Sequence, residues 1–453
     1  MDELNELLEK VNEHVKAGDL ARARQLLDEY RVQDVAAVLS ELDRDDALAL
    51  FRELDRELWA TAFSYLEHDY QVPLLDTLEQ EDGRFILSSM DPDDRTAFFE
   101  KLPEAERKRL LRLMPARDIK QALRLLGYPP ESTGRRMTPD FVAVRPDWSV
   151  GEALDHLRQR GEEGETINVV YVTDAQERLV GIVPLKRFVL GKPDRQVSEI
   201  MTSDVISAEV SEDREDTLQT IQHYDLAAVP VVDENHRLVG IVTYDDMMDV
   251  AEAESTEDFH KMGSVGVLNL NLNAASPWLL FQKRVGWLLI LVFVNMFAGE
   301  IIGAYEDALE GLFVLMTFLP LVVDSGGNAG TQSATLMVRA LATGDVKMGD
   351  WFRLLAKELG VALALGLAMA IAVFMVAYFW RTEAVFDVSA VIALGMIGVV
   401  TVGSLVGMLL PFGLAKLNLD PATASAPLIT SIADLAGIAM YFGIAAWILG
   451  LTV

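Results

Sequence analysis

Long, largely apolar segments set the second part of the chain apart from the first. Beyond residue 281, five segments are long enough to cross a membrane: 285–305, 309–341, 359–380, 388–415 and 435–453. The hydrocarbon core of a bilayer is about 30 Å thick, and a helix rises about 1.5 Å per residue. The pattern therefore predicts five membrane-spanning helices. The last one reaches back to Pro421 if Asp434 lies within it.

Residues 2–127 have the pattern of short amphipathic helices. Apolar residues recur at helical spacing, as in Val35, Leu39 and Leu42. Short acidic segments resemble helix starts, where carboxylates face the positive end of the helix dipole. We therefore expect an all-α domain of stacked helices, a solenoid, over residues 1–133.

Residues 137–250 contain an internal repeat. The copies begin with Met137-Thr138 and Met201-Thr202, and each later reaches an apolar segment, a turn and the sequence LVGIV. Each copy reads strand, helix, short strand, turn, strand, helix. We expect two small α/β domains, then a connecting helix and the membrane domain, at residues 134–198, 199–254, 255–280 and 281–453.

Charge is distributed as unevenly as hydrophobicity. The 453 residues include 39 Lys+Arg and 69 Asp+Glu, a net charge of −30, although 51% of them are hydrophobic. Only 9 of the basic and 12 of the acidic residues lie in 261–453, so the first part carries nearly all of the net charge. This composition excludes a single soluble globular domain, a coiled coil and a disordered chain. The predicted fold class is a multidomain membrane protein with an all-α cytosolic solenoid domain, an α/β pair and a five-helix transmembrane bundle.

The charges that flank the spans predict their orientation. Lys283 and Arg284 precede the first span, and further basic residues lie on the same side of the later spans. By the positive-inside rule, the N-terminus is cytoplasmic and the C-terminus outside, in a bacterial-type inner or plasma membrane. The start of the chain has no apolar signal segment, which agrees with this orientation. The acidic surface of the first part disfavours nucleic acid as a partner.

Asp434 is the first of three polar features in the apolar part. It lies deep in the fifth predicted span, where a lone carboxylate costs roughly 2.5–3.5 kcal/mol. We expect it to face a partner or a wet cavity as a ligand in an ion path. A structural hydrogen bond between helices is the alternative interpretation.

The second feature is a group of small and polar residues in the second span. Pro320 and Asp324 precede Gly326, Gly327 and Asn328. We expect them to break the helix, which a membrane tolerates only where the backbone is buried in protein or lines water. Freed carbonyls and the side-chain oxygens of Asn328 and Gln332 would then offer ligands to a hard cation, and Asp324 is a further candidate. Close helix packing through small residues is the alternative.

The third feature is the sequence DPATASAP, which begins at Asp420. Its two prolines predict an irregular start to the fifth span. Asp420 either caps the following helix or serves as a ligand at the pore mouth. The chain has no Cys, and no His lies in 281–453, so the membrane domain offers oxygen ligands only. That donor set favours Mg²⁺, Ca²⁺ or Mn²⁺ over Zn²⁺, copper or iron.

A dense acidic segment immediately precedes the membrane half. Its members are Asp245, Asp246, Asp249, Glu252, Glu254, Glu257 and Asp258. On a helix, Asp245, Asp249 and Glu252 share one face, where like charges repel unless cations neutralise them. We expect a gate whose repulsion divalent cations relieve, and a solvated helix is the alternative.

The repeat resembles a tandem pair of CBS domains, through its MT starts and the sequence VPVVD…LVGIVT around Pro230. Such pairs often bind adenosine nucleotides in the cleft between the copies. The second copy keeps the motif T-x-x-D, whose Asp is Asp246, whereas the first copy has Arg187 in that place. The resemblance implies ATP as a ligand near Arg187, Pro230 and Asp246. Arg187 argues against a site built by the first copy, and a purely structural pair is the alternative.

The whole chain resembles the MgtE family of magnesium channels and transporters, most specifically in GGNAGTQ at 326–332, DPA at 420–422 and Asp434. The resemblance implies a homodimer with one pore on its two-fold axis, where Asp434 and the GGN sequence contact hydrated Mg²⁺. It also implies that cytoplasmic Mg²⁺ binds acidic residues of the N-domain, the CBS pair and the connecting (plug) helix, and closes the pore. Asp91 and Asp94 would be the contribution of the N-domain.

The function we predict is Mg²⁺ uptake across the plasma membrane through a channel that cytoplasmic Mg²⁺ closes. A transporter of Ca²⁺, Mn²⁺ or Co²⁺ on the same architecture is the first alternative, because oxygen ligands do not separate these ions. A membrane enzyme or a signalling receptor is the second. The chain has no HExxH, GxSxG or P-loop sequence that would support an enzyme.

Overall fold

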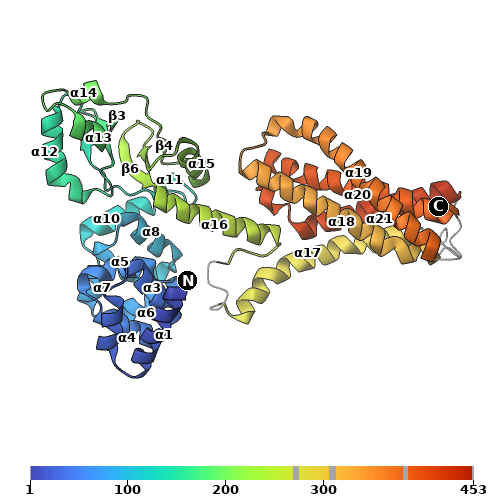
Figure 1. Ribbon diagram of the computed structural model, residues 1–453, viewed down its shortest axis with the longest axis horizontal. Coiled ribbons are helices and arrows are strands. Elements are labelled where there is room, and N and C mark those ends of the chain that lie inside the picture. The colour runs from blue at the N-terminus through green and yellow to red at the C-terminus, as the bar shows by residue number, and fades with distance from the viewer. Residues whose placement is uncertain (1, 269–274, 306–312, 381–385, 451–453) are drawn as a thin grey trace. The chain divides into compact units, whose positions relative to one another are not determined.

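The computed structural model describes residues 2–268, 275–305, 313–380 and 386–450 (Figure 1). The chain divides into two compact units, Met1–Ala253 and Glu254–Val453. The first unit contains the all-α domain and the repeat. The second contains the long apolar helices.

The all-α domain is built from ten short helices with a common core. Large side chains such as Phe51, Phe63 and Phe99 are almost completely buried within it. The prediction of an all-helical domain is confirmed. The helices are α1 (Asp2–Lys16), α2 (Leu20–Leu27), α3 (Val32–Glu41), α4 (Arg44–Glu53), α5 (Trp59–Tyr65), α6 (His68–Thr77), α7 (Gln80–Ser89), α8 (Pro92–Lys101), α9 (Glu104–Leu111) and α10 (Ala116–Leu125), with a short 3₁₀ helix, η1 (Arg56–Leu58), before α5.

The start of α8 shows why acidic residues gather at the ends of these helices. Asp91 occupies the N-cap with extended backbone, and Pro92 takes the first helical position, where its missing N–H costs nothing. Asp93 and Asp94 follow in the first turn, where the helix dipole favours negative charge. The same local preference thus places three carboxylates at one helix end.

The repeat forms two three-stranded sheets with the same topology. In the first, β1 is parallel to β2 and β2 is antiparallel to β3, and β4, β5 and β6 pair likewise. The elements of the first copy are α11 (Thr133–Arg136), β1 (Ala143–Val144), α12 (Val150–Arg160), β2 (Val169–Thr173), β3 (Leu179–Pro184) and α13 (Leu185–Leu190). Those of the second are α14 (Val197–Ile200), β4 (Ala208–Glu209), α15 (Arg214–Tyr224), β5 (Ala228–Val232), β6 (Leu238–Thr243) and α16 (Tyr244–Met262).

Each copy begins on the sheet of the other, which explains two parts of the repeated sequence. Thr138 bridges to Ile241 of β6, and Thr202 bridges to Ile182 of β3. A Cβ on Gly240 would lie 2.6 Å from the sulfur of Met137, and the equivalent glycine of β3 faces Met201 in the same way. Because the glycine of LVGIV has no side chain, the methionine of the other copy can pack against it.

The second unit contains the five predicted apolar helices. They are α17 (Pro277–Ala304), α18 (Phe313–Ala342), α19 (Trp351–Trp380), α20 (Phe386–Lys416) and α21 (Ala426–Leu449), all long and apolar enough to cross a membrane. The core lies between α18, α20 and α21, with Val391, Val399 and Tyr441 buried there. Residues 309–312 and 451–453 of the predicted spans, and 269–274 of the predicted connecting helix, lie outside the described residues.

The prediction that the second span is broken is wrong. Helix α18 continues from Phe313 to Ala342 through Pro320 and all of its glycines. The reason is that these glycines form a packing surface: a Cβ on Gly403 or Gly407 of α20 would overlap the backbone of Gly326 or Gly330. Tight packing against α20 stabilises the helix that local propensity disfavours, as the alternative interpretation proposed.

The connecting helix and the segment before α21 can also be compared with their predictions. The helix expected within 255–280 is α16, which begins earlier, at Tyr244 in the second copy, and ends at Met262. The segment before α21 is irregular, as predicted, because Pro421–Thr423 form a short 3₁₀ helix, η5, before α21 begins at Ala426.

Candidate ion pathway and regulatory site

Asp434 lies half-buried on α21 and faces α18. Its Oδ1 is buried and has no hydrogen-bond partner among the described residues. A Cβ on Gly327 of α18 would lie 2.8 Å from Cγ2 of Thr430 and 3.5 Å from Oδ1, so the glycine lets α18 pack closely against α21 beside the carboxylate. Because a buried carboxylate without a donor is costly at membrane depth, a cation or water is needed to satisfy it.

Helix α18 presents a polar stripe along the same region. Asp324, Asn328, Thr331 and Thr335 recur at three- and four-residue spacing, so they share one face. The Nδ2 of Asn328 donates to Oδ2 of Asp324 at 3.1 Å, which leaves its carbonyl oxygen free to accept. Asp324 and Asn328 are exposed.

An exposed polar stripe on a membrane helix must be covered by protein or by water. The oxygen atoms of Asp324, Asn328 and Asp434 are suited to a hard cation. Within the described residues, no three acidic or histidine side chains gather closely enough to enclose a bare metal ion. Mg²⁺ dehydrates reluctantly and usually keeps several waters, so a site that contacts its hydration shell does not need such a cage.

Asp420 lies at the start of η5 and makes two contacts. Its Oδ1 accepts from the backbone N–H of Ala422 at 2.8 Å, so Asp420 is a helix cap. Its Oδ2 lies 2.5 Å from Nζ of Lys261 on α16, and Lys261 also pairs with Glu257 at 2.6 Å. These two partners raise the pKa of Lys261 against the effect of its partial burial. Asp420 therefore contacts a protein cation in this structure.

In the first unit, Asp93 of α8 and Asp246 of α16 meet directly. Oδ1 of Asp93 is buried without a hydrogen-bond partner, and Thr243 donates its hydroxyl to Asp246. Burial is the first cause that raises the pKa of Asp93 well above its usual value, and the charge of Asp246 is the second. The pKa of Asp246 is also raised, chiefly by burial. Two carboxylates so placed cannot both be ionised unless a cation lies between them. Without a cation, the pair keeps one proton that the two carboxylates share.

More acidic residues surround this pair. Burial raises the pKa of Asp94 to about 6, with smaller contributions from the charges of Asp91, Asp246 and Asp249. Burial and the charges of Glu252 and Asp245 raise the pKa of Asp249. A cavity of about 210 Å³ lies among these side chains, lined by Asp93, Asp94, Asp246 and Asp249 and by Lys101, Arg136 and Arg214.

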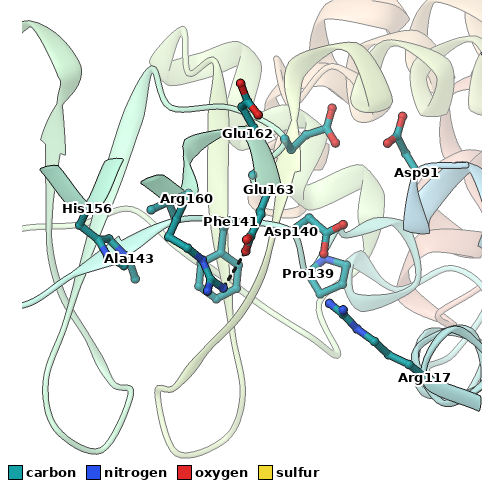
Figure 2. A pocket seen from close by; sticks show the side chains of 13 residues that line it. Asp91, Arg117, Pro139, Asp140, Phe141, Ala143, His156, Arg160, Glu162 and Glu163 are labelled. Carbon is teal, nitrogen blue, oxygen red and sulfur yellow. Dashed lines mark ion pairs between the residues drawn. The ribbon is translucent and has the colours of Figure 1, made fainter. Parts of the chain in front are cut away.

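A larger cavity, of about 930 Å³, opens beside Asp91 (Figure 2). Asp140, Glu162, Glu163 and Glu165 also line it. Of these four, only Glu163 forms an ion pair within the described part of the chain, with Arg160 at 2.6 Å. Partial burial, followed by the charges of Asp91 and Asp246, raises the pKa of Glu165 to about 7. The acidic region thus extends from α8 and α16 to the loop before β2.

The structure brings together some of the acidic residues that were predicted to bind cytoplasmic Mg²⁺. Asp91, Asp94, Asp246 and Asp249 lie in one acidic region, with Asp245 and Glu252 close enough for their charges to act there. Glu254 and Glu257 belong to the second unit, where Glu257 pairs with Lys261. Three participants were missed: Asp93, Glu165 and Lys261.

The nucleotide positions are engaged in contacts within the chain. Arg187 donates to the carbonyl of Ile200 at 2.8 Å and to the hydroxyl of Thr202 at 3.1 Å. Asp246 contacts Asp93 and Thr243, and Pro230 is buried in β5. Neither candidate ribose ligand is therefore free in this structure.

Comparison with known proteins assigns both units. Family models match at 30–131 (MgtE intracellular N domain), at 135–190 and 197–253 (CBS domain), and at 319–444 (divalent cation transporter). The magnesium transporter MgtE of Thermus thermophilus is 40% identical over 321 residues, 71% of each chain. The chain belongs to the MgtE family. The Bacillus subtilis magnesium transporter MgtE is 34% identical, over 71% of this chain and 70% of its own.

A solved structure supports the same assignment for the first unit. The cytosolic domain of the Mg²⁺ channel MgtE in complex with ATP is 33% identical, with a TM-score of 0.51, and the match covers 54% of this chain and 99% of that one. As an MgtE protein with five apolar helices, the chain is a multi-pass inner-membrane transporter of Mg²⁺ and not an enzyme. Mg²⁺ is therefore its substrate, and the enzyme alternative is excluded.

The regions that match MgtE include most of the candidate residues. Asp324, Asn328 and Asp434 fall within the transporter model, and Asp91, Asp93 and Asp94 fall within that of the N domain. Asp93 lies between two predicted acids at one helix start, so the sequence indicated its neighbourhood but not that Asp93 is the acid that meets Asp246. Lys261 carried no comparable signal, because its partner Asp420 lies 159 residues away.

Proposed function

We propose that the chain forms a Mg²⁺-selective pore in which Asp434 contacts the hydrated ion, and that cytoplasmic Mg²⁺ closes this pore by binding the acidic region of α8 and α16. The observation that carries the first part is the buried, unpartnered Oδ1 of Asp434, which lies beside Gly327 of α18. Gly326, Gly327 and Asn328 shape the α18 wall, and Asp324 adds a second carboxylate.

A homodimer, with the N-terminus cytoplasmic and the C-terminus outside, is part of the proposal. The exposed stripe at Asp324 and Asn328 needs a covering surface, and a second copy would supply it and place two Asp434 side chains around one ion. Selectivity for Mg²⁺ over Ca²⁺, Mn²⁺ and Co²⁺ is the finer part of the proposal, since the matched family is described as a divalent cation transporter. Competition of each ion with Mg²⁺ flux tests this selectivity.

The gate rests on repulsion that a divalent cation relieves. Asp93 and Asp246 are in contact, and Asp94, Asp249 and Glu165 add charge around them. Mg²⁺ bound there would hold α8 against α16, and α16 continues to Lys261 and its contact with Asp420. Several weak carboxylate contacts produce a population shift as the Mg²⁺ concentration rises. ATP is left out of this proposal, because Arg187 occupies the ribose position of the first copy.

The experiment that tests the proposal is Mg²⁺ flux into liposomes that contain the purified protein, with Mg²⁺ varied on the side of the first unit. Flux that requires Asp434 and falls as Mg²⁺ rises on that side supports both parts. Flux that ignores Mg²⁺ on that side removes the gate and keeps the pore. No flux with the wild-type protein contradicts the pore.

Replacing Lys261 with Met is expected to make closure need more Mg²⁺. Lys261 neutralises Asp420 and Glu257, and without its charge these two carboxylates repel each other. A partly exposed ion pair contributes up to about 1 kcal/mol, so the half-inhibitory Mg²⁺ concentration should rise about two- to fivefold. Lys261→Arg keeps the charge and serves as the control in the same flux assay. Equal inhibition curves for both variants and the wild type would contradict this role.

The acidic region also predicts how stability depends on pH. Asp94 and Glu165 have pKa values of about 6 and about 7 when folded, above those of the free side chains. The folded state therefore binds more protons than the unfolded state. The stability that these two groups contribute is complete below about pH 4 and is lost as the pH rises through their folded pKa values of about 6 and 7. We expect residues 1–253 in Mg²⁺-free buffer to lose about 1–3 kcal/mol of unfolding free energy between pH 5 and 8.

Urea unfolding of residues 1–253 at a series of pH values measures this change. Addition of Mg²⁺ should restore most of the lost stability at pH 8 and little at pH 5, because protonated carboxylates do not bind it. The variant Asp94→Asn with Glu165→Gln should show a flatter pH profile. A profile that does not change in this variant would assign the pH dependence to other groups.

A further inference from the structure

A groove on the all-α domain gathers basic side chains that neither the pore nor the gate uses. It has a volume of about 840 Å³ and lies between η1, α7 and the turn that joins α9 to α10. Arg56, Arg84 and Arg112 line it. In a chain with a net charge of −30, three guanidinium groups in one groove need a reason.

The three arginines differ in what they contact. Arg56 is held in place, since it pairs with Asp82 at 2.9 Å and lies 4.7 Å above the ring of Phe85. The side chains of Arg84 and Arg112 are exposed, and neither forms a hydrogen bond or ion pair with another residue that the structure describes. Two unpaired positive charges thus face one groove.

Some arginines of this domain pair with acids of neighbouring helices. Arg24 pairs with Asp55 at 2.8 Å, and Arg109 pairs with Asp76 at 2.6 Å. Carboxylates are plentiful in this domain, and Glu81 itself lines the groove without pairing with Arg84 or Arg112. The nearest acid of the groove therefore leaves both guanidinium groups without a carboxylate partner in the part of the chain that the structure describes.

Neutral donors lie in the same groove. The Oγ of Ser88 is buried and has no hydrogen-bond partner among the described residues. Pro115, which also lines the groove, is the N-cap of the ten-residue helix α10 and has no side-chain group that could cap it. The first N–H groups of α10 are therefore left for a ligand or water, and the positive end of its dipole favours an anion.

We propose that this groove binds a phosphate-bearing small anion, with Arg84 and Arg112 as its charged ligands and Ser88 and the N-terminus of α10 as neutral donors. A guanidinium group matches the geometry of phosphate oxygens and can donate two hydrogen bonds to one phosphate. A single phosphate would fill only a small part of the groove. A compound with two or more phosphates uses both unpaired arginines, so it should bind more tightly than inorganic phosphate.

Equilibrium dialysis of the full-length protein in detergent, with labelled pyrophosphate or inorganic phosphate and without Mg²⁺, tests the proposal at one fixed ionic strength. We expect one site per chain and tighter binding of pyrophosphate. The double variant Arg84→Gln/Arg112→Gln should weaken pyrophosphate binding by at least about tenfold, since hydrogen bonds between charged groups are lost. Both side chains are exposed and unpaired, so thermal unfolding should stay unchanged.

Arg44→Gln/Lys120→Gln is the matched control. It removes two exposed positive charges from the same domain, outside the groove. Equal loss of binding in both double variants would show non-specific attraction and overturn the proposal. Loss with Arg187→Gln would move the site to the cleft of the repeat and overturn it as well. Absence of pyrophosphate binding to the wild-type protein would do the same, whatever the flux assays show.

Discussion

Replacing Asp434 with Asn is expected to reduce Mg²⁺ flux by at least about a hundredfold, because a charge-assisted contact of about 3 kcal/mol with the ion is lost. Asn has nearly the same volume as Asp, so the packing against Gly327 should survive. The change removes the charge and leaves the shape of the site. Flux into liposomes, followed with a Mg²⁺-sensitive dye inside them, measures the effect.

The control for this variant is Asp387→Asn. It makes the same chemical change in the first turn of α20, at an exposed position away from the polar stripe. We expect its flux to stay within about twofold of wild type, as for a surface substitution. Wild-type flux in Asp434→Asn would remove Asp434 from the ion path. A similar loss in both variants would point to damage of the fold.

Replacing both Asp93 and Asp246 with Asn is expected to remove the response of flux to Mg²⁺ on the side of the first unit. These carboxylates are in direct contact, and burial raises the pKa of both. Without them the acidic region loses its most buried cation ligands. The half-inhibitory Mg²⁺ concentration should rise by at least about tenfold, or the response should vanish.

The level of flux in this variant identifies what holds the gate. High flux at every Mg²⁺ concentration would show that a bound cation must bridge α8 and α16 to close the pore. Low flux at every concentration would show that repulsion between the two carboxylates opens it. Asp45→Asn, an acid in the first turn of α4, should leave inhibition unchanged. An unchanged inhibition curve in Asp93→Asn/Asp246→Asn would refute the gate.

Helix α18, which the sequence predicted to be broken, shows where sequence reasoning failed and why. Proline and glycine disfavour a helix by local propensity, and that is all a single segment reveals. The contact of Gly326 and Gly330 with the backbone of α20 is a tertiary fact, since Gly403 and Gly407 come from another helix. Packing between helices outweighs propensity here, so the same glycines that predicted a break produce a close contact.

The acidic region illustrates a smaller error of the same kind. The sequence predicted Asp91 and Asp94 and passed over Asp93, which lies between them. Which of the three acids at the start of α8 faces Asp246 depends on how α8 is rotated about its axis against α16. No local sequence pattern reveals that rotation. Glu165 was missed because it comes from a loop, where periodicity carries no information.

The sequence by itself determined the five apolar helices, the all-α domain, the two copies of the repeat and the family, since these depend on local hydropathy, period and motif. Tertiary structure alone decided that α18 stays unbroken, that Asp93 meets Asp246, and that Lys261 reaches Asp420. It also decided that Arg84 and Arg112 share a groove with the start of α10. Each of these depends on residues far apart in the chain, and only the packing of whole elements brings such residues together.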